Sequence, residues 1–209
     1  RAIMLRHSRK YDKISLTIVT KESKLPSKDL LVNKLIERYP NIITIVHNIN
    51  PDKTNVVLGA KSKILYGKDD LKDELLGNEY EISHKSFYQV NSEQTEALYK
   101  KAMDYAQLKP NDTVVDAYCG IGTIGLTAAK DVKEVIGMDV VKESIQNAKQ
   151  NAKHNNIKNA RFMVGKAEEL LPQMHDTHVD VLFIDPPRKG VEKPFLEAIV
   201  KMKIKRVVY

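Results

Sequence analysis

Three glycines near the middle of the chain have types and spacing suited to holding a nucleotide-like ligand. Gly120, Gly122 and Gly125 follow the pattern G-x-G-x-x-G, and the apolar run 113–115 precedes them. A glycine-rich turn between a strand and a helix lets the backbone approach a ligand closely at the helix N-terminus. The pattern predicts a cofactor site, and by itself it fits both a nicotinamide dinucleotide and S-adenosylmethionine.

Carboxylates at three predicted strand ends separate these two cofactors. Asp139 is placed to accept hydrogen bonds from the ribose hydroxyls of either one. Asp116 precedes the glycines, where it can meet a methionine ammonium or organise the turn, whereas in a dinucleotide site it would face the pyrophosphate. Asp185 opens a stiff Asp185-Pro186-Pro187 turn and can accept hydrogen bonds from N–H groups of a base. Together these carboxylates favour S-adenosylmethionine.

The elements that position these residues alternate between strand and helix. Apolar runs predict strands at 113–116, 134–139, 161–164 and 179–185, with a last strand from Arg206. Helical patterns fall between them at 123–130, 142–155, 168–171 and 193–202. Asn91, followed three residues later by Gln94, predicts the cap of a helix through Ala106. The alternation predicts a buried parallel sheet with helices on both faces and a ligand beyond the carboxyl ends of its strands.

The first part of the chain has a different pattern. It predicts a strand at 14–18, a helix capped by Ser27, a hairpin of 42–46 and 56–58 around the turn 50–55, and weaker strands at 64–66 and 80–82. We interpret it as a small α+β domain with an antiparallel sheet. The predicted domains are therefore 1–85, a small α+β domain, and 86–209, a cofactor-binding domain.

Charge and cysteine content limit the partners and the compartment. The chain has 34 Lys and Arg against 27 Asp and Glu, a net charge of +7, which suits a polyanion such as RNA. No apolar run is long enough to span a membrane. The single cysteine, Cys119, excludes an internal disulfide and is too few for a zinc or iron–sulfur site, and it fits a reducing cytoplasm. His175 and His178 have ligand-like spacing but no third ligand, so no metal is expected.

Three motifs together resemble the RNA (uracil-5-)-methyltransferases, the bacterial 23S rRNA and tRNA enzymes that make 5-methyluridine. These motifs are Asp116-Ala117-Tyr118-Cys119-Gly120-Ile121-Gly122, Asp185-Pro186-Pro187-Arg188-Lys189-Gly190 and Ser86-Phe87-Tyr88-Gln89-Val90-Asn91. The resemblance implies a class I S-adenosylmethionine methyltransferase fold, Rossmann-like, preceded by the family's central domain. It also implies an enzyme that methylates C5 of a uridine in RNA, in 23S rRNA rather than in tRNA.

The same resemblance assigns roles to residues. Gln89, Tyr118 and Asp139 line the cofactor site, with Gly120 at the closest backbone approach. Asp185 lies between the cofactor and the target uracil. Asp139 departs from the family, whose members often have Glu at this position with one methylene more reach. From their residue types alone, Tyr88 is a candidate for stacking on the base or for a core position, and Arg188 and Lys189 are candidates for contacts with phosphates or for a solvated turn.

Uracil C5 is a poor nucleophile, so its methylation requires a thiolate to add to C6 and a base to remove the C5 proton. Cys119 lies inside the glycine turn and is expected to be a packing residue. The resemblance places the nucleophilic Cys and the basic Glu after Tyr209, and further sequence before Arg1. We therefore expect a fragment with a truncated sheet edge that can bind S-adenosylmethionine without methylating RNA.

Three other functions remain open at the level of sequence. The main alternative is an S-adenosylmethionine-dependent methyltransferase of guanine or adenine amino groups in RNA, which needs no thiolate. Such sites usually have Tyr or Phe where this chain has Arg188. The others are a nicotinamide-dependent reductase and a noncatalytic RNA-binding module.

Overall fold

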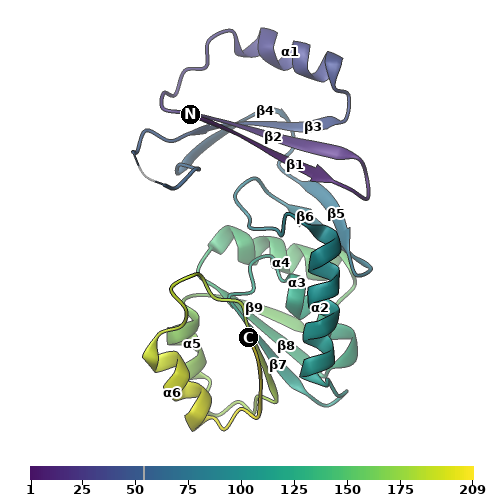
Figure 1. Ribbon diagram of the computed structural model, residues 1–209, viewed down its shortest axis with the longest axis vertical. Coiled ribbons are helices and arrows are strands. Elements are labelled where there is room, and N and C mark those ends of the chain that lie inside the picture. Colours follow the sequence, from purple (N-terminus) through teal and green to yellow (C-terminus); the bar gives the residue numbers. More distant parts are fainter. Residues whose placement is uncertain (54) are drawn as a thin grey trace. The chain divides into compact units, whose positions relative to one another are not determined.

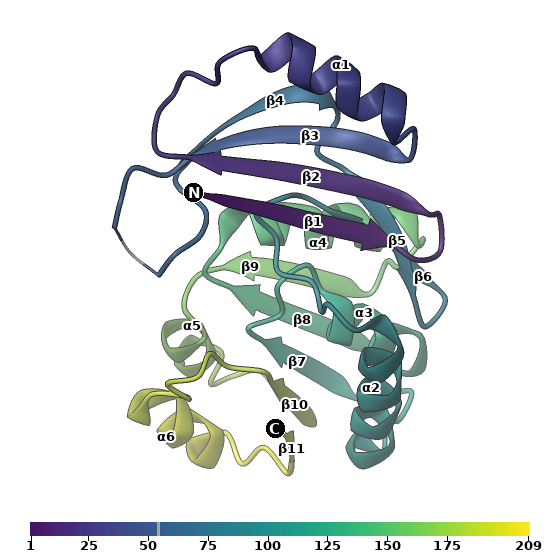
Figure 2. The same ribbon diagram turned by 45° about the horizontal axis from the view of Figure 1, so that its top comes forward.

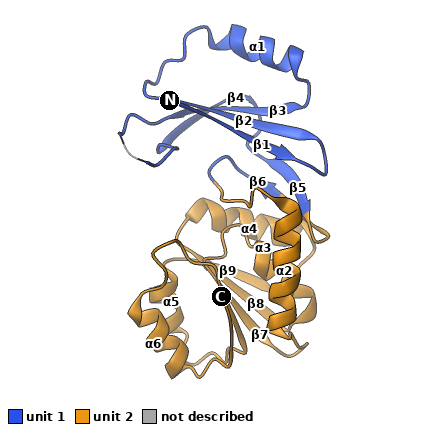
Figure 3. Ribbon diagram, in the orientation of Figure 1, with its two compact units in different colours: residues 1–74, 81–85 blue, residues 75–80, 86–209 orange. Residues whose placement is uncertain are grey.

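The computed structural model describes residues 1–53 and 55–209. The chain folds into two compact units, coloured separately in Figure 3. Unit 1 comprises residues 1–74 and 81–85, and unit 2 comprises residues 75–80 and 86–209. Residues 75–80, which the sequence analysis places in the first domain, group with the second.

Unit 1 is a four-stranded sheet with one helix (Figures 1 and 2). The strand order is β1 (Ala2–Ser8), β2 (Lys13–Thr20), β3 (Ile42–Ile49) and β4 (Lys61–Gly67). β1–β2 and β3–β4 are antiparallel, but β2–β3 is parallel. The prediction of an antiparallel sheet is wrong for this central pair, because helix α1 (Lys28–Arg38) carries the chain back between β2 and β3. A helical crossover is the usual way to join parallel neighbours.

The helix of unit 1 packs on the sheet through a small apolar core. Val32 of α1 is buried with Leu16 of β2 and with Ile42 and Ile45 of β3. Ser27 does precede α1, but it has left-handed backbone angles and its side chain makes no capping hydrogen bond, so the predicted cap is absent. Packing of Val32, rather than a cap, therefore stabilises this helix.

The hairpin predicted for residues 42–46 and 56–58 does not form. Val56, Val57 and Leu58 belong to no strand, and β3 pairs with β4 instead. The side-chain amide of Asn50 donates to the carbonyl oxygens of Val56 and Val57 at 2.8 and 3.0 Å, which satisfies these groups outside the sheet. Thr54, part of the predicted turn, lies outside the described residues.

Two strands have no clear signal in the sequence. In β1 the side chains alternate between half-buried and exposed, so no apolar face is visible. β5 (Leu71–Leu75) has three consecutive charged residues between two leucines, and its buried Asp73 accepts a hydrogen bond from Ser8 at 3.0 Å. β5 forms a two-stranded sheet with β6 (Asn78–Ile82).

Unit 2 is a five-stranded sheet flanked by helices. The order is β11 (Arg206–Val208), β10 (Val181–Ile184), β7 (Thr113–Ala117), β8 (Glu134–Asp139) and β9 (Ala160–Val164), and every neighbouring pair is parallel. The helices are α2 (Ser92–Ala106), α3 (Thr123–Ala128) with a short 3-10 turn (Ala129–Asp131), α4 (Lys142–His154), α5 (Ala167–Gln173) and α6 (Lys193–Lys201). The predicted alternation and parallel sheet are confirmed. The side chain of Asn91 also caps α2, accepting from Gln94 N at 3.2 Å.

Apolar side chains cover both faces of this sheet. Val115, Ile136 and Leu182 pack against α5 and α6, where Leu171 and Phe195 are buried. Alternate residues such as Val114 and Val135 pack on the other face with Ala106 and Ala128 of α2 and α3. Because both faces are buried, the strands are almost continuously apolar, as in other parallel sheets.

Within the described part of the chain, no helix is long and apolar enough to cross a membrane.

Candidate active site

The turn after β7 exposes its backbone at Gly120. Tyr118, Gly120 and Gly122 have φ angles of 63°, 54° and 85°, in the left-handed region that glycine adopts easily. A Cβ atom built on Gly120 would meet no heavy atom within 4 Å, so open space lies beside this residue. The backbone here can therefore be approached closely by a ligand.

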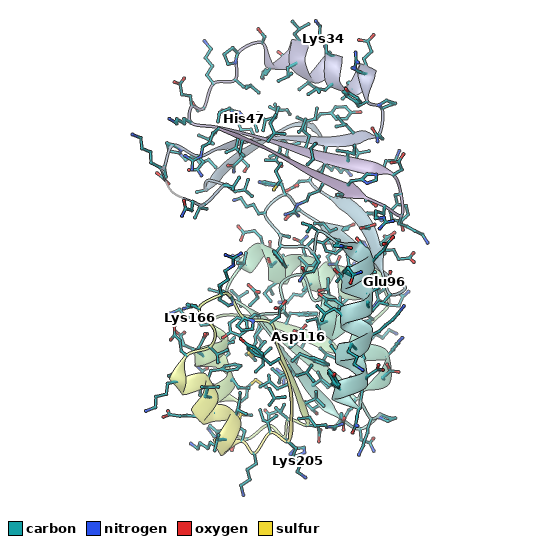
Figure 4. All side chains as sticks on the ribbon, in the orientation of Figure 1. Lys34, His47, Glu96, Asp116, Lys166 and Lys205 are labelled. Atoms are coloured by element: carbon teal, nitrogen blue, oxygen red, sulfur yellow. The ribbon has the colours of Figure 1, made fainter. Side chains whose placement is uncertain are left out.

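Asp116 holds the far end of the same turn. Its carboxylate accepts a hydrogen bond from the backbone nitrogen of Gly125 at 2.7 Å, and both residues are buried. Figure 4 labels Asp116 among the side chains of unit 2. Burial raises the pKa of Asp116 to about 7, an effect that the Gly125 hydrogen bond opposes and the nearby Asp185 and Asp139 reinforce. Of the two roles expected for Asp116, the structure shows the organising one.

Asp139 ties the end of β8 to the glycine turn. One oxygen accepts from the backbone nitrogen of Gly120 at 2.9 Å, and the other accepts from Val141 N at 2.8 Å. Each carboxylate oxygen has further acceptor capacity. The side chain is half-buried, so it can still receive ligand hydroxyl groups while it fixes the turn.

Gln89, Tyr118, Gly120 and Asp185 line one hollow at the carboxyl ends of β7 and β10. The other lining residues are Phe87, Tyr88, Tyr99, Asp116, Cys119, Ile121, Thr123 and Ile124. The enclosed volume is about 30 Å³, on the order of one water molecule, so only a small part of a ligand is enclosed there. Partial burial raises the pKa of Asp185. The structure thus brings four of the five predicted residues together, and Asp139 joins them through Gly120.

Tyr118 spans from the glycine turn to helix α5. Its hydroxyl donates to a carboxylate oxygen of Glu168 at 2.7 Å, and its ring packs against Phe195 with 6.0 Å between centroids. Burial and the Glu168 carboxylate raise the pKa of Tyr118. The ring orientation is therefore fixed from both sides of the half-buried side chain.

Cys119 is a packing residue in this structure. It is 7% exposed, and burial, together with Asp116 and Asp139, raises the pKa of its thiol well above the ordinary value. A Cβ built on Gly137 would approach its sulfur at 3.0 Å, so the thiol packs against that glycine together with the Phe162 ring. The thiol form is favoured, which disfavours a role as nucleophile.

Two tyrosines that the sequence analysis did not select hold the start of α3. Tyr99 shares a hydrogen bond with the Thr123 hydroxyl at 2.8 Å, and the Tyr80 hydroxyl donates to the Thr123 carbonyl oxygen at 3.3 Å. Tyr80 is 0% exposed and Tyr99 is 4% exposed. Tyrosines buried this deeply need partners for their hydroxyls, but no spacing in the sequence indicates that both meet one threonine.

The aromatic residue that faces outward at the hollow is Phe87 rather than Tyr88. The Phe87 side chain is 67% exposed, although it lines the hollow. Tyr88 packs against Tyr80, with 6.4 Å between ring centroids, and its hydroxyl oxygen is buried. Of the two roles expected for Tyr88, the structure favours the core one. The sequence does not indicate which of the adjacent residues Phe87 and Tyr88 is exposed.

His175 and His178 are the pair with the spacing of metal ligands. Each histidine contacts a neighbouring carboxylate, Asp176 and Asp180 respectively, at 2.9 Å. Across residues 1–53 and 55–209, no three His, Cys, Asp or Glu side chains are grouped as they would be around a metal ion. Lys189, after the Asp185 turn, pairs with Glu192 at 3.0 Å, and Arg188 is exposed.

Comparison with known families identifies the kind of domain in unit 2. Residues 108–205 match the family model described as a methyltransferase domain. The fold of unit 2 is accordingly the Rossmann-like fold of class I S-adenosylmethionine methyltransferases, as the sequence predicts.

Curated relatives match the chain along its whole length. An uncharacterized RNA methyltransferase of Clostridium tetani is 45% identical over 211 residues, which is 100% of this chain and 46% of the relative. One of Oceanobacillus iheyensis is 46% identical over the same length and coverage. The chain therefore spans about half the length of these relatives, and its homologues are RNA methyltransferases.

Solved structures extend the comparison to both units. The tRNA (uracil-54, C5)-methyltransferase of Pyrococcus abyssi, in complex with S-adenosyl-L-homocysteine, has a TM-score of 0.75 and 27% identity. The match covers 95% of this chain and 46% of that one. The tRNA m1G37 methyltransferase of M. jannaschii, 16% identical with a TM-score of 0.57, shares the fold over 95% of this chain and 57% of its own. These findings agree with S-adenosylmethionine as the cofactor and not with a nicotinamide dinucleotide.

Proposed function

We propose that this chain is part of an S-adenosylmethionine-dependent RNA methyltransferase that acts on C5 of a uridine, with rRNA as the preferred substrate. The observation that carries the proposal is the convergence of Gln89, Gly120 and Asp185 on one hollow at the carboxyl end of a parallel sheet. Ligands of open α/β sheets bind at this position. The homologous RNA methyltransferases support RNA as the substrate.

The residues of the hollow fit the methyl donor by their chemistry. When bound, S-adenosylmethionine supplies an electrophilic methyl group on a sulfonium. Asp139 would accept hydrogen bonds from its ribose hydroxyls, the Gly120 backbone would contact it closely, and Gln89 and Tyr118 would line its site. The open space beside Gly120 and the half-buried Asp139 carboxylate suit these contacts.

The acidic side chains near Gly120 also suit a cationic ligand. Asp139 and Asp185 make the local potential more negative, and they add to the effect of burial in raising the pKa of Asp116. A sulfonium and an ammonium group are attracted to such a site, whereas a pyrophosphate is repelled. The electrostatics of the hollow therefore favour S-adenosylmethionine among nucleotide-like cofactors.

Asp185 is the residue proposed to face the base. Its turn is held by Pro186 and Pro187, which limit the backbone conformations available. A carboxylate here can accept a hydrogen bond from a ring N–H of uracil and so fix the base relative to the methyl donor. Phe87, an exposed residue that lines the same hollow, offers a ring on which an unstacked base can lie.

Methylation at C5 also needs a thiolate, and Cys119 does not supply it in this proposal. It is the only cysteine of the chain, and its thiol is buried with a raised pKa. We therefore propose that the nucleophile and the base come from sequence beyond this chain. The 209 residues alone are expected to bind the cofactor without catalysing transfer to uridine.

Two observations favour C5 of uridine over an amino group. The residue after Asp185-Pro186-Pro187 is the exposed Arg188, where amino-group enzymes usually have an aromatic side chain. The Pyrococcus abyssi uracil-C5 enzyme also matches both units, with 27% identity. The amino-group alternative predicts turnover by the 209 residues without any further cysteine.

Cofactor binding is the first test. Calorimetric titration with S-adenosylhomocysteine is expected to give one site in the unchanged chain and much weaker binding in Gly120→Val, whose side chain would occupy the open space. Asp104→Asn, on the exposed face of α2, is the matched control and should bind as the unchanged chain does. Binding of NADH in preference to S-adenosylhomocysteine would contradict the proposal.

The product decides the target atom. A protein that carries this chain at the length of its curated relatives is incubated with unmodified rRNA and S-adenosylmethionine, and the nucleosides are separated by mass spectrometry. We expect 5-methyluridine and release of tritium from 5-tritiated uridine. Methylguanosine or methyladenosine would instead support the amino-group alternative, and activity of the 209 residues alone would return Cys119 to consideration.

A further inference from the structure

The positive charge of the chain is concentrated in unit 1. Unit 1 has 16 Lys and Arg against 10 Asp and Glu, a balance of +6, whereas unit 2 has 18 against 17, a balance of +1. The cofactor hollow lies entirely in unit 2. The excess positive charge, which suits a polyanion, therefore lies in unit 1. None of the residues that line the cofactor hollow belongs to that unit.

Strand register brings four lysines of unit 1 to one end of its sheet. Thr20 at the end of β2 is paired with Ile49 of β3, and Ile49 is paired with Lys61 of β4. One pleat further along, Ile18, His47 and Lys63 are aligned in the same way. Lys21 and Lys24 follow β2 directly, so they emerge at the same end. We call Lys21, Lys24, Lys61 and Lys63 the lysine cluster.

Contacts hold these segments together. The Lys63 ammonium donates to the Ser23 carbonyl oxygen at 3.5 Å, which joins β4 to the turn after β2. The Thr20 hydroxyl donates to the Glu22 carbonyl oxygen at 2.6 Å and lies 2.7 Å from Nε2 of the buried His47. The turn is thus fixed from within the sheet, and the cluster keeps a defined geometry.

The ammonium groups of the cluster are exposed and not neutralised. All four lysines are exposed, and among the described residues none of them forms an ion pair with a carboxylate. Lys21 and Lys24 line an open hollow with Arg1, Thr20 and Glu22, whose carboxylate is the one acidic group of that lining. Lys63 also helps burial to lower the pKa of His47, as expected of a locally positive surface.

We infer that the lysine cluster binds RNA phosphates and so gives unit 1 a substrate-holding role of its own. The backbones of β2 and β4 lie about 10 Å apart, two interstrand spacings, because β3 runs between them. Four flexible lysine side chains that begin on two such strands can contact several phosphates of one RNA chain, more than one small anion offers. Lysine contacts to phosphates position an RNA and do not select its sequence. The choice of RNA among polyanions rests on the proposed function. The inference that the lysine cluster binds a polyanion does not rest on it.

Salt dependence of RNA binding tests the inference. Binding of a fluorescein-labelled oligouridine to the whole chain is measured by anisotropy over a series of KCl concentrations, without cofactor. The quadruple variant Lys21→Gln, Lys24→Gln, Lys61→Gln, Lys63→Gln should bind at least about tenfold more weakly. Its slope of log affinity against log salt should fall in magnitude by about 2 to 3, since each lost phosphate contact removes roughly 0.7.

A control of equal charge separates a specific surface from general attraction. Lys130, Lys133, Lys153 and Lys158 are exposed in unit 2, in segments that lead into the amino ends of β8 and β9 and so lie opposite the cofactor hollow. Their change to Gln should leave the slope within about half a unit of the unchanged chain. Equal loss in both quadruple variants, or no RNA binding by the unchanged chain, would overturn the inference. So would binding of polyglutamate as tight as that of oligouridine.

Titration with S-adenosylhomocysteine distinguishes this inference from the proposed function. The lysine-cluster variant should keep the affinity of the unchanged chain for S-adenosylhomocysteine and its thermal unfolding midpoint. If no form binds the cofactor while the difference in slope persists, the proposed function fails and the RNA surface stands. If the cofactor binds and the slopes are equal, the RNA surface fails alone.

Discussion

The backbone nitrogen of Gly125 donates to the buried carboxylate of Asp116 at 2.7 Å, so the strand before the glycine turn directly supports the helix after it. A Cβ on residue 125 would lie 2.9 Å from that carboxylate oxygen and 2.9 Å from a Val135 methyl. Gly125→Ala should therefore destabilise the fold by about 1 to 3 kcal/mol and weaken S-adenosylhomocysteine binding. Thermal unfolding and calorimetry measure the two effects.

Asp116→Asn is the matched variant for this contact. The amide is nearly isosteric and keeps an acceptor oxygen for Gly125, so at about pH 4, where Asp116 is protonated in the folded chain, its unfolding midpoint should stay close to that of the unchanged chain. A Gly125→Ala protein as stable as the unchanged one would show that the close approach of these two residues is not required.

The raised pKa of Asp116 predicts a pH-dependent stability. Burial moves this pKa from 3.8 to about 7, so the folded chain keeps a proton that the unfolded chain loses between about pH 4 and pH 7. The free energy of unfolding should therefore fall as pH rises through that window, by at most about 4 kcal/mol from this residue, and then level off. Urea unfolding at several pH values, with Asp116→Asn for comparison, measures it.

The Asn variant removes the titrating group, so its stability should change less over the same range. Equal slopes for the two proteins between pH 4 and pH 7 would show that Asp116 does not hold the proton.

Unit 2 could be predicted in detail because its signals are local. Strand 134–139 and the Asn91 cap follow from apolar runs and from one cap residue, and both are present. The errors in unit 1 concern pairing across the chain. Val56 and Val57 are as apolar as the residues of a strand, yet the Asn50 side chain donates hydrogen bonds to their carbonyl oxygens outside the sheet. Such side-chain competition with sheet hydrogen bonds is not visible in periodicity.

Asp139 predicts a coupling between the turn and the cofactor. Because its two oxygens hold Gly120 and Val141, Asp139→Ala removes two hydrogen bonds along with the proposed ribose contact. We expect at least about a tenfold loss of S-adenosylhomocysteine affinity and a destabilisation of about 1 to 3 kcal/mol.

Asp139→Glu adds the methylene common in the resembling family and should retain more affinity than Ala. Calorimetry on both variants checks this order. Unchanged affinity in Asp139→Ala would remove Asp139 from the cofactor site.

Sequence could place the acidic residues of the site but not the groups that hold them. Asp116 and Asp139 come at strand ends, a position that the chain order alone indicates. The hydrogen bonds of Tyr80 and Tyr99 with Thr123 depend on packing between segments more than 20 residues apart. The exposure of Phe87 depends on the conformation of its loop. Only the folded chain shows these relationships.

Phe87 should contribute to RNA binding and not to cofactor binding. Its ring is 67% exposed at the rim of the hollow, where it can stack on an unpaired base. Phe87→Ala should weaken oligouridine binding by about 1 to 3 kcal/mol, the usual effect of losing one stacked base, and leave the slope against salt unchanged. Phe87→Tyr keeps the ring and should bind as the unchanged chain does. Equal binding by Phe87→Ala would show that the ring contacts no base.

The division of the chain into units has a consequence for anyone who cuts it. The backbone passes from one unit to the other after residues 74, 80 and 85, so neither unit is a continuous segment. A gene fragment beginning at Ser86 would lack Tyr80, a wholly buried residue of unit 2, and Glu79, whose backbone exchanges two hydrogen bonds with the Asn155 side chain. The two functions proposed for the units are therefore inherited together. Recombination between homologues that exchanged one unit would have to join the chains within the β5–β6 strand pair, because no single linker separates the units.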